Sequence, residues 1–175
     1  MKKILLGLVV LSMVTSLNAR VLKKSVIEIA PRVSIYIGEL NAFGMNPDFG
    51  IGSDIVFNPL KNIGFRIGAG EILFNGGTYF MLNQGTLSTF PKFDALIYIP
   101  MRQMNPYVHA GFGLTTGEGF TLLAIGGGMG FDFQMRKGTT LFIEPGLYIV
   151  SASNGESDTD AMFRLTLGAK FGLFR

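Results

Sequence analysis

The sequence lacks cysteine and tryptophan entirely, and its 175 residues contain a single histidine, His109. Thiol nucleophiles, cysteine-ligated zinc and disulfide frameworks are therefore excluded, and one histidine cannot build a multi-histidine metal site. Charge is scarce as well, because 15% of the residues are charged, against roughly 25% in an ordinary soluble domain. The length leaves room for one domain, and the composition does not suit an ordinary soluble surface.

The first 19 residues have the three parts of a secretory signal peptide. Lys2 and Lys3 precede an apolar run over 4–14, and small residues follow up to Ala19. This run of 11 residues would rise about 16 Å as a helix, which is too short for the roughly 30 Å of a bilayer core. We therefore expect residues 1–19 to be removed and residues 20–175 to form one domain, without a lipid-anchoring cysteine.

Apolar and polar residues alternate with a period of two in eight segments, and no later apolar run is long enough for a membrane helix. Each segment is close to the 9 to 11 residues or so that a tilted strand needs to cross a bilayer. The pattern predicts an all-β fold, an eight-stranded antiparallel up-and-down transmembrane β-barrel. The eight segments are 27–38, 49–58, 63–73, 87–99, 106–115, 121–133, 139–150 and 161–174.

The predicted connections alternate in length. Short segments rich in turn formers cover 58–62, 100–105 and 134–138, whereas the intervening connections cover 39–48, 74–86, 115–120 and 151–160. Three of these four are longer than the turns. Short turns at one end and long loops at the other are typical of bacterial outer-membrane barrels, with the turns on the periplasmic side.

The composition of the polar face indicates which face of the predicted barrel wall is inside. The polar face consists mostly of Gly, Ser, Thr and Ala, and it carries too few charged residues for the exterior of a soluble protein. Repeated glycine on an inward face suits a narrow lumen. A soluble barrel with the opposite orientation is the alternative. The charged residues predicted to line the lumen are five acids and five bases: Glu28, Asp54, Asp94, Asp132, Glu144, Arg32, Arg66, Lys92, Arg164 and Lys170.

These ten charges predict a lumen that is neutral overall and plugged by ion pairs, because an unpaired buried ion is costly. If Phe57 pairs with Ile63, Asp54 lies directly opposite Arg66. Glu28 and Lys170 are both expected near the periplasmic end of the seam that closes the barrel.

The other charges of the predicted mature chain separate by sign between the two ends. The bases lie on the amino-terminal segment, the short turns or the carboxyl end, and the acids lie at or beyond the long-loop ends. The predicted basic rim is Arg20, Lys23, Lys24, Lys61, Arg102, Arg136, Lys137 and Arg175. The predicted acidic rim is Glu39, Asp48, Glu71, Glu118, Glu156, Asp158 and Asp160.

Two glycine-rich segments carry a family resemblance. The segment from Asn105 to Gly113 and the run from Gly126 to Gly130 resemble strand motifs of small eight-stranded outer-membrane barrels, the OmpX-like, OmpW-like and opacity-type proteins. The last segment resembles their carboxyl-terminal sorting signal, although Arg175 follows Phe174 where the family ends on Phe. The resemblance implies outer-membrane lipid and the barrel-assembly machinery as partners.

No catalytic or cofactor-binding site is predicted. No serine lies beside His109, so a lumenal histidine is favoured over a catalytic one, and Glu144 with Asp132 is assigned to the plug rather than to acid/base chemistry. The run 126–130 does not match a phosphate loop, and no nucleic-acid patch is present. The one site-like stretch is a loop with four cation-ligand candidates, Asn154, Glu156, Asp158 and Asp160.

The loop does not match a calcium-binding loop, because Thr159 stands where glycine is needed and Leu165 stands where the last glutamate is needed. A solvated acidic loop is therefore favoured.

The favoured function is a non-enzymatic, monomeric outer-membrane barrel that acts structurally or through its loops 39–48, 74–86 and 151–160. The alternatives are a narrow channel for small solutes, a barrel that releases an apolar ligand sideways, and a lipid-modifying enzyme.

Overall fold

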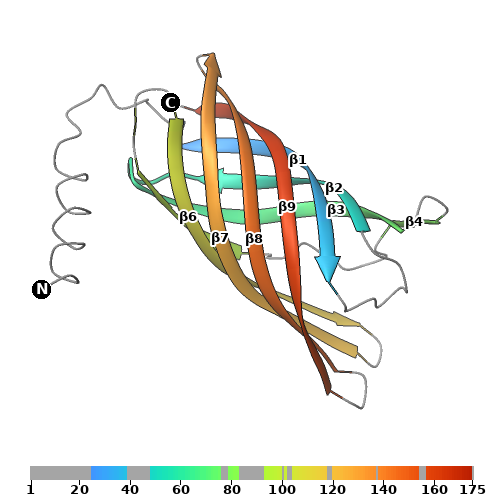
Figure 1. Ribbon diagram of the computed structural model, residues 1–175. Coiled ribbons are helices and arrows are strands. Elements are labelled where there is room, and N and C mark those ends of the chain that lie inside the picture. The colour runs from blue at the N-terminus through green and yellow to red at the C-terminus, as the bar shows by residue number, and fades with distance from the viewer. Residues whose placement is uncertain are drawn as a thin grey trace, which may run out of the picture.

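The computed structural model describes residues 25–38, 48–75, 79–82, 93–99, 101, 104–117, 120–136, 138–153 and 157–174 (Figure 1). Within these residues the chain forms strands alone, and no helix there is long and apolar enough to cross a membrane. The strands are β1 (Ile27–Gly38), β2 (Asp48–Phe57), β3 (Ile63–Asn75), β4 (Tyr79–Leu82), β5 (Phe93–Tyr98), β6 (Met104–Gly117), β7 (Phe120–Arg136), β8 (Thr139–Ser153) and β9 (Ser157–Phe174).

The strands close into an eight-stranded antiparallel barrel. Consecutive strands pair with each other, apart from β4 and β5, and β9 pairs with β1 to complete the ring. The short β4 and the strand β5 both pair with β3, whose other edge is occupied by β2, so they share the fourth position. The predicted all-β, up-and-down barrel is confirmed, and β6 to β9 run side by side across the front of Figure 1.

Strand register sets the tilt of the barrel. A path of directly paired residues that starts at Glu28 returns to β1 at Gly38, ten residues further along. With the normal rise and spacing of strands, this stagger tilts them by about 40° from the barrel axis. The path runs through Val56, Arg66, Asp94, Gly111, Gly126, Tyr148 and Met162.

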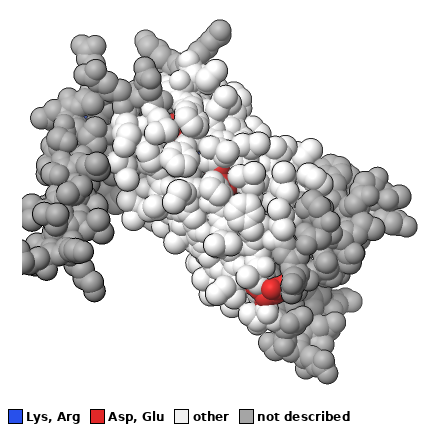
Figure 2. All heavy atoms as spheres, viewed as in Figure 1, with Lys and Arg blue, Asp and Glu red and all other residues white. Residues whose placement is uncertain are grey.

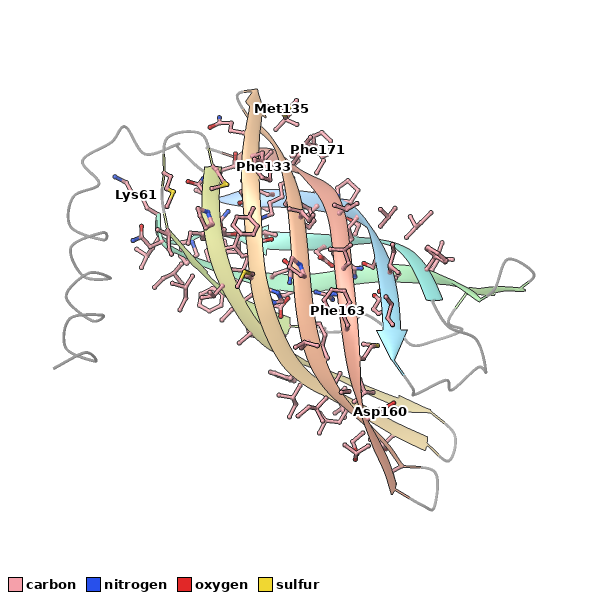
Figure 3. All side chains as sticks on the ribbon, in the orientation of Figure 1. Lys61, Phe133, Met135, Asp160, Phe163 and Phe171 are labelled. Carbon is pink, nitrogen blue, oxygen red and sulfur yellow. The ribbon has the colours of Figure 1, made fainter. Side chains whose placement is uncertain are left out.

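Apolar side chains cover the outside of the barrel and charged side chains fill the inside. Of the charged residues whose side chains are described, all are buried except Lys61 and Asp160. Figure 3 places these two at opposite ends of the molecule. The outward apolar side chains are half exposed on every strand for which exposure is given, as with Ile51, Ile125 and Leu147. The face in Figure 2 is accordingly almost free of charge over its described part.

Inward aromatic rings lie against glycines on the neighbouring strands. A Cβ atom at Gly130 would overlap the hydroxyl end of the ring of Tyr107, its direct partner across the β6–β7 ladder. The inward glycines therefore make room for large rings in a lumen that is otherwise too narrow for them. The same pairing recurs for Gly126 with Tyr148 and for Gly168 with Phe142.

The strand ends differ from the prediction at the end of the barrel remote from the short turns. Segment 151–160 is mostly strand, because β8 runs to Ser153, β9 starts at Ser157, and Val150 pairs with Asp160. Segment 115–120 is likewise mostly strand. The polar residues of these two segments predicted loops. Beyond the apolar belt of the barrel, however, a strand can continue with polar side chains on both of its faces. Residues 83–92, with the predicted start of the fourth strand, and the signal segment 1–19 lie outside the described residues.

Candidate functional site

The lumen holds a chain of buried charges centred on Glu144 of β8, whose side chain is fully buried. Arg66 of β3 donates from Nη1 to Oε2 at 2.6 Å and from Nη2 to Oε1 at 3.0 Å. Arg164 of β9 donates to Oε1 at 2.7 Å, and the hydroxyl of Tyr107 donates to Oε2 at 2.8 Å. One carboxylate therefore ties together strands β3, β6, β8 and β9 across the lumen.

Arg66 extends this connection to β5. Its Nε donates to Oδ2 of Asp94 at 2.7 Å, and its Nη2 contacts the same oxygen. Since the guanidinium also bonds Glu144, it lies between two carboxylates from different strands. Planar, charge-assisted contacts of this kind fix geometry more firmly than single neutral hydrogen bonds.

A second part of the chain of charges is built on Arg32 of β1. Its Nε donates to Oδ2 of Asp54 at 3.0 Å and its Nη1 to Oε1 of Glu71 at 2.6 Å. Tyr36 donates to the other oxygen of Glu71 at 2.6 Å. Asp54 Oδ2 lies 3.9 Å from Nε of Arg66, so the two parts are joined. His109 of β6 lies beside the joined set, with Nδ1 3.7 Å from Oδ1 of Asp94 and Nε2 3.6 Å from Oε1 of Glu144. We call the whole set the central cluster, and it comprises Arg32, Asp54, Arg66, Glu71, Asp94, His109, Glu144 and Arg164.

A separate pair lies nearer the short turns. Lys170 of β9 donates to Oδ1 of Asp132 at 2.7 Å. Its ammonium lies 4.5 Å from the ring centre of Tyr107, 5.1 Å from that of Phe142 and 5.4 Å from that of Tyr98. The charge is thus held by a carboxylate and three aromatic faces, an environment that stabilises a desolvated cation.

Glu28 lies at the same end of the β1–β9 seam as Lys170, because it pairs with Gly172, two residues further along β9. Its Oε2 accepts a hydrogen bond of 3.1 Å from the side chain of Asn58, which also donates to the carbonyl of Ser25 at 3.0 Å. Glu28 thus links β1 to the turn after β2 through an uncharged partner. Sequence reasoning expected both Glu28 and Lys170 near this end of the seam, and it did not single out Asn58.

Two sequence expectations about the charges are wrong: the turn after β2 sets a different register from the one expected, and a bulge in β3 reverses the alternation beyond it. Phe57 pairs with Phe65 rather than Ile63, so Asp54 faces Gly68 instead of Arg66 and its hydrogen bond comes from Arg32. Between Ser53 and Asp54 the register with β3 shifts.

This bulge lies at Ala69 of β3, and it reverses the in–out alternation beyond that residue. Glu71, expected on the acidic rim, is therefore buried in the lumen at 7% exposure. The described lumen consequently holds six acids against four bases rather than five of each: Glu28, Asp54, Glu71, Asp94, Asp132, Glu144, Arg32, Arg66, Arg164 and Lys170. Lys92, also expected there, lies outside the described residues.

Two of the four candidate cation ligands lie in a strand. Asp158 and Asp160 lie in β9 opposite Ala152 and Val150, and Oδ1 of Asp160 accepts from the backbone N–H of Ala161 at 2.6 Å. Asn154 and Glu156 lie outside the described residues. Within the described part of the chain, no group of three or more histidine or acidic side chains is placed to hold a metal ion.

Of the expected rim charges, the exposed side chain of Lys61 lies in the turn after β2. Asp48 starts β2 and Arg136 ends β7. The following expected rim charges lie outside the described residues: Arg20, Lys23, Lys24, Arg102, Lys137, Arg175, Glu39 and Glu118.

Comparison with known proteins leaves the family open. No family model matches the chain, and no curated protein matches it. Among solved structures, a chain described as "De novo design of transmembrane beta-barrels" is similar with a TM-score of 0.42 and 11% sequence identity. The similarity covers 86% of this chain and 98% of that one.

Proposed function

We propose that this chain is an integral, non-enzymatic barrel of a bacterial outer membrane, exported by its signal peptide and delivered by the barrel-assembly machinery. The observation that carries the proposal is the inversion of polarity between the two faces of the wall. Leu147 is 65% exposed, whereas the carboxylate of Glu144 three residues away in the same strand is fully buried. A soluble barrel needs the reverse arrangement, because water has to meet its outer face.

The same arrangement suits a bilayer. A closed barrel satisfies its backbone hydrogen bonds internally, which is what hydrocarbon demands of any spanning structure. An outward belt without charge and a polar interior are the pattern of outer-membrane barrels. We also propose that the barrel belongs to the OmpX-like, OmpW-like and opacity-type group, because the segments 105–113 and 126–130 resemble the strand motifs of that group.

The proposed role is structural, or it is an interaction with another molecule through the paired ends of β6 to β9. We do not propose transport of solutes through the lumen. The bonds from Arg66 to Asp94 and Glu144 cross the lumen from one wall to another. A solute passing through would have to break these buried, charge-assisted contacts. Breaking any one of them leaves a buried ion without its partner and without water, which is energetically costly. The lumen is therefore proposed to be closed in the resting protein.

Three measurements on the full chain, expressed in a Gram-negative host, test this function. We expect it in the outer-membrane fraction, migrating faster on gels before boiling than after it, and giving no steady conductance in planar bilayers. Recovery as a soluble monomer without detergent would contradict the membrane assignment. Steady single-channel openings by a chain that does fold in the membrane would instead contradict the closed lumen and favour the narrow channel.

A further inference from the structure

Four buried side-chain atoms in the lumen have no hydrogen-bond partner among the described residues and belong to neighbouring side chains. They are Oδ1 of Asp94 on β5, both ring nitrogens of His109 on β6, and the hydroxyl of Tyr148 on β8. None of these three side chains is more than 4% exposed. A buried polar group without a partner is costly, and native proteins almost always supply one.

The four atoms lie around the imidazole ring of His109. Its Nδ1 is 3.7 Å from Oδ1 of Asp94, and its Nε2 is 3.6 Å from Oε1 of Glu144. The centroids of the His109 and Tyr148 rings are 6.4 Å apart. The unpartnered atoms therefore form one polar site between β5, β6 and β8.

The adjacent strands offer this site no side chain on one side of each residue. There each of the three residues pairs directly with a glycine: Asp94 with Gly111, His109 with Gly128 and Tyr148 with Gly126. A glycine has no side chain that could donate or accept a hydrogen bond. The missing partner of each polar atom therefore has to be a bound molecule.

The distances at the imidazole suit a bridging water. A direct N–H···O hydrogen bond spans about 2.7–3.2 Å, so the separations of 3.7 and 3.6 Å leave both ring nitrogens unbonded. They are short enough for one water molecule to lie at hydrogen-bond distance from both atoms of a pair. Such water-mediated contacts are nearly as favourable in enthalpy as direct ones.

The mixture of donors and acceptors identifies the chemical class of the ligand. A carboxylate accepts, an imidazole has at least one N–H group in either protonation state, and a tyrosine hydroxyl does both. Water can donate and accept at the same time, and it satisfies all of them. A metal ion needs acceptors alone, and the described part of the chain places no group of histidine and acidic side chains to hold one. The carboxylates of Asp94 and Glu144 disfavour an anion.

We propose that the central cluster contains an internal hydration site beside His109. Ordered water at this site joins the imidazole to Asp94 and to Glu144, and it bonds the hydroxyl of Tyr148. Arg66 already bonds both carboxylates on their other side, so the water completes a ring of contacts through β3, β5, β6 and β8. The inference rests on the closed lumen of the proposed function, which is then closed to solutes but not dry.

The first test is a crystal structure of the detergent-solubilised barrel at a resolution that shows ordered water. We expect electron density for water within about 3.2 Å of a ring nitrogen of His109 and of a carboxylate oxygen of Asp94 or Glu144. Ring nitrogens that bond the two carboxylates directly, with no water density beside them, would overturn the proposal.

The second test uses the sign of the effect of Tyr148→Phe, which removes the hydroxyl and keeps the ring. If the hydroxyl bonds ordered water, its loss should lower the folding equilibrium constant several-fold. Tyr36→Phe is the matched reference, because the hydroxyl of Tyr36 donates directly to Glu71 at 2.6 Å. Removing a buried hydroxyl that had no partner would instead raise the constant. An unchanged or higher constant for Tyr148→Phe in lipid vesicles, beside a lower one for Tyr36→Phe, would overturn the proposal.

Conductance in planar bilayers separates failure of the hydration site from failure of the proposed function. Direct contacts at His109 in the crystal, together with no conductance, would overturn the hydration site and leave the closed lumen standing. Steady openings by a barrel that shows ordered water at His109 would contradict the closed lumen and support the site.

Discussion

Replacing Glu144 with glutamine is expected to lower the free energy of unfolding by about 3–5 kcal/mol, because removing one partner leaves buried ions without their counter-charge. Glu144 accepts bonds from Arg66, Arg164 and Tyr107, and all of these side chains are buried. Glutamine keeps the size of the side chain but offers the two guanidinium groups one neutral oxygen. Urea titration of the barrel refolded in lipid vesicles measures the loss.

Asp160→Asn is the matched control for this substitution. Asp160 lies near the start of β9, is partly exposed, and its carboxylate bonds the adjacent backbone N–H of Ala161. Removing this charge should change the free energy of unfolding by less than about 0.5 kcal/mol. Equal, small losses at Glu144 and Asp160 would show that the buried contacts contribute little, and the account of the lumen would be wrong.

A single arginine on the outer wall should be costly at mid-height and tolerated at the edge. Met129 lies near the middle of β7 and is 53% exposed, while Leu60 lies in the turn after β2 and is 60% exposed. In a bilayer, Met129→Arg should cost about 2–4 kcal/mol of unfolding free energy and Leu60→Arg at most about 1 kcal/mol, because the cost of a charge depends on depth.

Because Met129 and Leu60 are almost equally exposed, the comparison separates a hydrocarbon environment from water at the outer wall. If water covered the outer wall, both substitutions would be surface changes worth about 0.5 kcal/mol or less. Urea unfolding in vesicles gives both values under one condition. A cost at Met129 no larger than the cost at Leu60 would contradict a hydrocarbon environment at the middle of the barrel.

The sequence predicted the barrel well because alternation is a strong signal wherever one face is apolar and the other is not. Strand β1 was predicted with its observed bounds, and the predicted inward positions of Arg32 and Glu144 agree with their burial. Period two sets which face a residue occupies, and that requires no knowledge of its partners.

Register and partners could not be derived in the same way. A bulge adds one residue and inverts every later position, which moved Glu71 from the expected rim into the lumen. The small residues from Gly68 to Gly70 were the available signal, since glycine inside a strand often marks a bulge. Tyr36 of β1 bonds Glu71 of β3, and Asn58 bonds Glu28 of β1. No local sequence pattern encodes which residues of different strands meet in this way.

The proposal that the outer wall faces lipid is tested most directly by single cysteines, because the chain contains none of its own. Cysteines replace Ile125, Leu147 and Leu167 on the outer wall, with Leu60 in the turn as the aqueous reference. Each variant carries a spin label and is reconstituted in lipid vesicles. We expect the three wall positions to be relaxed by oxygen and protected from a water-soluble relaxation agent, and the turn position to show the reverse. Wall positions as accessible to the water-soluble agent as the turn would contradict the account.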